Sequence, residues 1–150
     1  MTAKEYLNLP RELNDMINKQ AQHISLLRDI AQNTTVTLGG ETVSHSRNVS
    51  SQQDIINAII DAEKKQDEMV DALVDLKAEM IRLFERISDI KLCMVLELRD
   101  IALLNWDAVA TRMKCCKRYA IRLHDLAEKE IENFSEIFEK SHPITFNDIR

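Results

Sequence analysis

The chain has 150 residues with only two Gly and two Pro, few aromatics and many Leu, Ile, Lys and Glu, which excludes a sheet-rich protein and predicts an all-α fold. A hydrophobic share of 45% and a net charge of −5 exclude a disordered or generally basic chain. No apolar run approaches the ~18 residues of a membrane span, and no secretory signal is present, so we expect a cytoplasmic protein without membrane contact.

The first predicted element is an amphipathic helix whose apolar residues recur at three- and four-residue steps from Tyr6 to Ala31. We expect its regular part to begin near Pro10, because proline is tolerated at the first helical position. The polar stretch Asn33–Ser51, which contains Gly39-Gly40, predicts a loop, with a short hairpin about the Gly pair as a less favoured alternative.

The next predicted element is one long helix from Gln52 to Asp89, interrupted by the charged run Glu63–Glu68. A helix of this length cannot bury its apolar stripe alone. We therefore expect it to fold back on the first helix, so that residues 1–90 form a long antiparallel, coiled-coil-like hairpin that serves dimerisation or partner binding.

Shorter elements follow, and they predict a helix-turn-helix within residues 91–140. Lys91–Arg99 is an apolar helix, and residues 101–104 turn the chain. Asn105 is a good N-cap for a helix that ends near Met113. A last helix runs from about Lys117 to about Glu139, and residues 141–150 form a tail.

The helix-turn-helix requires small or apolar residues where its two helices cross. The spacing places six such residues inward: Val109, Ala110, Met113, Cys115, Ala120 and Leu123. Trp106 is expected to anchor the first of the two helices on Leu96 or Leu126.

Positive charge gathers in this segment, because residues 91–125 carry seven Lys and Arg against four Asp and Glu. The second helix of such a motif presents its outward face, and above all its N-terminal residues, to the DNA major groove. Arginine suits guanine and lysine suits phosphate. The candidate DNA-binding residues are Lys117, Arg118, Tyr119 and Arg122 on that face, with Arg112 and Lys114 beside the turn.

Several segments resemble a family of small phage and prophage proteins of unknown function. They are Val95–Arg99, Trp106, Val109-Ala110, Arg118 and Arg122–His124, with weaker likeness at Thr2–Leu7 and Leu73–Glu79. The C-terminal module of that family is similar to region 4 of bacterial sigma factors, as in phage late-gene regulators. The resemblance implies sequence-specific DNA binding. This chain departs from the family pattern at Lys114, Cys115 and Cys116, where a small turn residue, a Tyr and a capping Ser are usual.

The leading hypothesis is therefore a phage or prophage transcriptional regulator that binds double-stranded DNA as a homodimer, with RNA polymerase or another host protein as a further candidate partner. The alternative is a coiled-coil interaction protein, such as a phage inhibitor that binds a host protein without specific DNA recognition. The acidic net charge favours this alternative, because nonspecific DNA affinity depends on phosphate neutralisation.

Neither catalysis nor a bound cofactor is expected. The chain has no P-loop, no nucleophile elbow and no Ser/His/Asp arrangement. Its three cysteines, two of them adjacent, lack the spacing of a zinc site or a disulfide framework, which fits a reducing cytosol. His124 is expected to be a surface or capping residue, and a metal site is not predicted.

Overall fold

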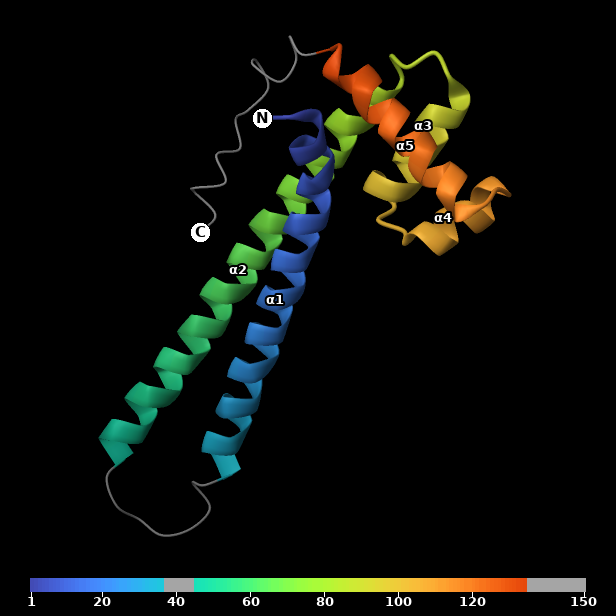
Figure 1. Cartoon of the computed structure of the whole chain (residues 1–150). Helices are drawn as coiled ribbons and strands as arrows, with labels where there is room; N and C mark the ends of the chain where they lie inside the picture. The colour runs from blue at the N-terminus through green and yellow to red at the C-terminus, as the bar shows by residue number, and fades with distance from the viewer. Residues whose placement is uncertain (37–44, 135–150) are drawn as a thin grey trace. The chain divides into compact units, whose positions relative to one another are not determined.

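The computed structural model describes residues 1–36 and 45–134, with side chains for residues 1–33 and 51–134. It contains six helical elements (Figure 1): α1 (Ala3–Val36), α2 (His45–Phe84), α3 (Ile90–Leu96), the π-helical segment η2 (Glu97–Ile101), α4 (Trp106–Met113) and α5 (Lys117–Glu132). The described ranges hold no β-strand, so the predicted all-α fold is confirmed. The Gly39-Gly40 hairpin alternative and the tail at 141–150 lie outside the described residues.

The described chain divides into two compact units. The hairpin unit is Asp15–Asp71, and the core unit joins Met1–Asn14 to the described residues from Ala72 onward. None of the helices in the described ranges combines the length and the apolar character needed to cross a membrane. The domain division at residues 90 and 140 stays a prediction.

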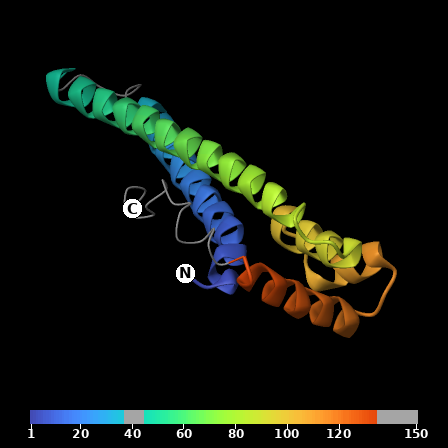
Figure 2. The same cartoon turned by 90° about the horizontal axis from the view of Figure 1, so that it is seen from above.

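In the hairpin unit, α1 and α2 lie side by side and run in opposite directions, as Figures 1 and 2 both show. Ile24, Ala62 and Met69 are buried, and Gln20 and Gln66 are half-buried. The Gln20 side chain donates from Nε2 to the Ala62 carbonyl oxygen over 3.0 Å. A polar side chain that bonds across the pair in this way favours one register of the two helices.

Helix α1 begins seven residues before the predicted start at Pro10, which was wrong. Thr2 and Glu5 form a capping box: the Glu5 amide donates to Thr2 Oγ1 over 3.2 Å, and the Thr2 amide donates to Glu5 Oε2 over 2.7 Å. These bonds cap the N-terminal end of α1. Pro10 therefore lies inside the helix, where its lost N–H bond is offset by full burial of its ring.

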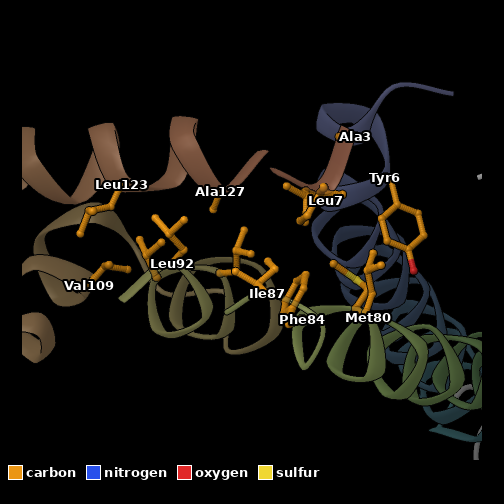
Figure 3. Packing of buried hydrophobic residues seen from close by; sticks show 14 of the residues in the cluster. Ala3, Tyr6, Leu7, Met80, Phe84, Ile87, Leu92, Val109, Leu123 and Ala127 are labelled. Atoms are coloured by element: carbon orange, nitrogen blue, oxygen red, sulfur yellow. The ribbon is translucent and has the colours of Figure 1, made fainter. Parts of the chain in front are cut away.

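The core unit is organised around one apolar cluster, seen from close by in Figure 3. Leu7 from α1 and Phe84 from α2 meet Ile87, which follows α2. Leu92 from α3 continues the cluster toward Leu123 on α5. The start of α1 and the end of α2 therefore share the core that supports α4 and α5.

Other helix boundaries also differ from the predicted ones. Helix α1 runs on to Val36 and α2 begins at His45, so the predicted loop Asn33–Ser51 is wrong at residues 33–36 and 45–51, which are helical.

Helix α2 ends at Phe84, where the amides of Arg86 and Ile87 make i→i−3 bonds to Leu83 and Phe84. Asp89 then caps α3, because its Oδ1 accepts from the Lys91 amide over 2.8 Å. Helix α5 ends at Glu132, where the amides of Asn133 and Phe134 make i→i−3 bonds that tighten the last turn. The predicted helix 91–99 is instead α3 followed by the π-helical segment η2.

Candidate nucleic-acid interface

Helix α4 begins where the sequence predicted, and two features fix its first turn. Asn105 adopts an extended backbone, and its Oδ1 accepts from the Ala108 amide over 2.8 Å. The Trp106 ring lies under the Arg99 guanidinium at 4.5 Å and packs edge-on against His124 at 5.3 Å between ring centroids. The ring is half-buried against the core cluster. Trp106 is held by packing against the cluster, with Arg99 and His124 as its ring partners. Leu126, one of its two predicted contacts, is 45% exposed.

The turn between α4 and α5 is a Schellman motif. The Lys114 amide donates to the Thr111 carbonyl oxygen over 3.2 Å, and the Cys115 amide donates to Ala110 O over 3.0 Å. Lys114 occupies the left-handed region, at φ 53° and ψ 44°. A residue with a Cβ pays about 1–2 kcal/mol for this conformation, and glycine avoids the cost. Lys114 is therefore the strained residue of this turn.

Helix α5 starts without a side-chain cap. Cys116 has the extended backbone of an N-cap, at φ −79° and ψ 152°, but its thiol makes no capping hydrogen bond. Its carbonyl oxygen accepts from the Tyr119 and Ala120 amides, each over 3.1 Å. A serine hydroxyl at this position would accept one of the unpaired amides of the first turn.

The crossing of α4 and α5 is closely packed. Val109 and Ala120 are fully buried, Ala110 is 7% exposed and Leu123 is 6% exposed. Met113 and Cys115 are half-buried at the edge of the same cluster. The predicted inward register is confirmed, and it fixes which side chains of α5 point outward.

The outward side chains of α5 form a mostly cationic ridge. Arg118, Arg122, Asp125 and Lys129 follow one another at helical spacing opposite the buried face, and all four are exposed. Tyr119 stands beside the ridge and is 42% exposed. A shallow hollow is lined by Arg118, Tyr119, Arg122 and Asp125, together with Cys116 and Ile121.

The remaining three cationic candidates lie away from the centre of this ridge. Arg112 and Lys114 are exposed at the end of α4 and in the turn. Lys117 points toward α4, where its Nζ pairs with Asp107 Oδ1 at 3.1 Å. Both side chains of this pair are more than half exposed, so the pair contributes little stability. Asp107 nevertheless offsets the charge of Lys117, which makes Lys117 the weakest cation of the set.

Sequence reasoning missed a polar cluster behind α5. His124 Nε2 and Asp100 Oδ2 lie 2.8 Å apart, and Asp100 is 7% exposed. Burial raises the pKa of the Asp100 carboxyl, and the bond to His124 opposes that shift. Arg99 donates to the Leu104 carbonyl oxygen over 2.7 Å, and burial lowers the pKa of its guanidinium. The available signal was the spacing of His124, four residues after Ala120 and three before Ala127, which predicts the flank of the buried face rather than a surface position.

Neither family models, nor curated proteins, nor solved structures give a match to this chain.

Proposed function

We propose that this protein is a phage or prophage transcriptional regulator that binds specific DNA through α4 and α5, used as a sigma-region-4-like helix-turn-helix. The observation that carries the proposal is the ridge of α5. Arg118 and Arg122 are exposed on its first turns, and the opposite face of the same helix is buried, so their direction is fixed. The N-terminal residues of a recognition helix are the ones that reach base edges.

The surrounding charges support the same surface. Arg112 and Lys114 flank the ridge and are suited to phosphate contacts, which position a protein on the duplex without reading sequence. Tyr119 offers a partly exposed hydroxyl and ring beside Arg122. Asp125 is the one acid on the ridge, and an acid among the cations favours a selective contact over general adhesion to DNA.

The test is a DNA-binding series on the full chain with two matched double variants. Duplexes selected from a random pool are measured by fluorescence anisotropy across a salt range. Arg118→Ala with Arg122→Ala should lower the salt slope of log K by about 2 and remove the site preference. Lys64→Ala with Lys65→Ala removes the same charge from exposed positions of the hairpin unit and should leave site preference unchanged.

Two outcomes would overturn the proposal. Absence of any complex at low salt would remove DNA binding altogether. Equal losses from both double variants would show that net charge alone, and not the α5 ridge, governs the complex.

Dimerisation through the hairpin is part of the proposal. Leu26 and Ile30 on α1 and Ile56, Ile60 and Val70 on α2 are large apolar side chains exposed by 39% or more. Two copies present paired half-sites, which raise affinity and specificity. Sedimentation should give twice the mass of one chain, and Ile56→Lys with Ile60→Lys should restore the monomer.

The same exposed side chains favour the alternative function, an interaction protein whose hairpin binds a host protein. This alternative predicts a monomer in isolation and the same low DNA affinity for both double variants. The salt series and the sedimentation measurement therefore discriminate between the two functions.

A further inference from the structure

A hollow of about 510 Å³ in the core unit lies beside the Asp100–His124 pair. It is bordered by the first turns of α1, by η2, by the start of α4 and by one flank of α5. That flank contributes three side chains with metal-binding atoms, His124, Asp125 and Glu128. His124 and Glu128 are half-buried and Asp125 is exposed, so the three side chains extend from the hollow to solvent.

The three donor atoms are close enough to share one ion. One imidazole nitrogen and one carboxylate oxygen from each acid lie within 4.8 Å of one another. Donors at about 2.0–2.2 Å from a common transition-metal ion are at most roughly 4.4 Å apart. Small rotations of the exposed Asp125 and the half-buried Glu128 side chains close this difference.

A second observation concerns the other nitrogen of the same imidazole. His124 Nε2 and Asp100 Oδ2 lie 2.8 Å apart, and an ionised carboxylate can only accept, so with Asp100 ionised the neutral ring carries its proton on Nε2 and leaves a lone pair on Nδ1. Metal-binding histidines almost always bond through their second nitrogen to a carboxylate or carbonyl group in this manner. Asp100 lies in the π-helical segment η2, a rare distortion that frequently marks functional sites.

We propose that His124, Asp125 and Glu128 bind one divalent transition-metal ion, with Asp100 as the residue that positions the imidazole. A donor set of one nitrogen and two carboxylate oxygens suits Zn²⁺, Co²⁺ or Ni²⁺, and the nitrogen disfavours Mg²⁺ and Ca²⁺. Three protein donors leave the remaining coordination positions to water. Metal binding at this site does not require DNA.

One consequence rests on the proposed function. Asp125 also lines the shallow hollow with Arg118 and Arg122 on the outward ridge of α5. An ion bound by this carboxylate adds positive charge at the one acidic side chain of the ridge. Metal binding should therefore strengthen the DNA complex, which makes the site a candidate regulator of that complex.

The test uses the full chain, freed of metal by a chelator and titrated with Co²⁺ alone. Trp106 is the single tryptophan, and its ring lies 5.3 Å from the His124 ring, so its fluorescence reports binding at this place. Saturable quenching at one equivalent, reversed by Zn²⁺, is expected. Glu128→Gln should weaken Co²⁺ binding at least tenfold, whereas Glu132→Gln, an exposed acid on the same helix, should not change it.

Asp100→Asn tests the positioning role. We expect Co²⁺ affinity to fall about 10–100-fold. The nitrogen shifts of the His124 ring, measured by NMR on the metal-free protein, should show a mixture of tautomers in the variant and one tautomer in the parent. A structural role alone would leave the tautomer unchanged.

The proposal is overturned if quenching does not saturate, or if the Glu128 and Glu132 variants bind Co²⁺ equally. Because quenching is measured without DNA, a saturable site in a protein that does not bind DNA would sustain the metal site while the proposed function fails. Conversely, DNA binding that persists without any saturable quenching would remove only the metal site.

Discussion

The core unit and the hairpin unit are both helical, but they are stabilised in different ways. Eighteen buried hydrophobic residues form one cluster in the core unit. Among the described residues of the hairpin unit, the buried hydrophobic side chains are Ile24, Ala62 and Met69, while Leu26 and Ile60 are more than half exposed. Tertiary packing stabilises the core unit. The hairpin unit depends on two helices in register, and part of its apolar surface stays exposed.

The largest expected effect comes from emptying one buried position in each unit. Phe84→Ala in the core unit should lower the free energy of unfolding by about 3–5 kcal/mol, because Phe84 is 1% exposed among rigid neighbours. Met69→Ala in the hairpin unit should cost about 2 kcal/mol, the low end for a buried Met, because two helices relax more easily around a cavity. Urea unfolding gives both values, and equal losses would mean that the hairpin is packed as firmly as the core.

The two units should differ in how their stability depends on pH. Burial raises the pKa of Asp100 in the core unit above its ordinary value of 3.8, against the opposing influence of His124, Arg99 and Arg11. The protonated carboxyl therefore stabilises the fold below pH 3.8, and this contribution is lost as pH rises through the raised pKa. The Asp100→Asn variant has no carboxyl to ionise at this position, so it does not lose this stability as pH rises.

The stability of the Asn variant relative to the parent should thus increase with pH, by about 1.4 kcal/mol for each unit by which the pKa is raised. Thermal unfolding of the metal-free protein between pH 3 and pH 8 measures the difference. Asp71→Asn, an exposed carboxyl in the hairpin unit, is the matched control. A difference that stays constant over the whole range would contradict the account of Asp100.

The sequence predicted the parts of the fold that depend on local pattern. Apolar periodicity located the long helices, and the Asn105 cap and the inward positions Ala110 and Ala120 located the helix-turn-helix. The Thr2–Glu5 capping box is also a local signal, and it outweighs Pro10 as the marker of the helix start. Its two bonds cap the helix at its N-terminal end. A proline at the eighth residue of the helix does not break them.

Other features depend on contacts distant in sequence and were not predictable from spacing. The bond between Asp100 and His124 spans 24 residues and crosses from η2 to α5. The ion pair of Lys117 with Asp107 depends on how α4 and α5 cross, and it changes the weight of one candidate DNA contact. The π-helical segment interrupts an otherwise regular apolar helix, and it contains no Gly or Pro that would have predicted the interruption.

The smallest expected effect is a gain of stability confined to the core unit. Lys114→Gly places in the left-handed turn position a residue without a Cβ, which relieves strain but adds freedom to the unfolded chain. The net gain should be about 0.5–1 kcal/mol in urea unfolding, with hydrogen exchange slowed in α4 and α5 and unchanged in the hairpin.

The same substitution removes one cation beside the proposed DNA-binding ridge, so stability and DNA affinity should move in opposite directions. Lys114→Ala is the control, because it removes the charge but keeps the Cβ and therefore the strain. It should weaken DNA binding as much as the Gly variant while giving no stability. A Gly variant no more stable than the Ala variant would show that the backbone of this turn is not what limits the core unit.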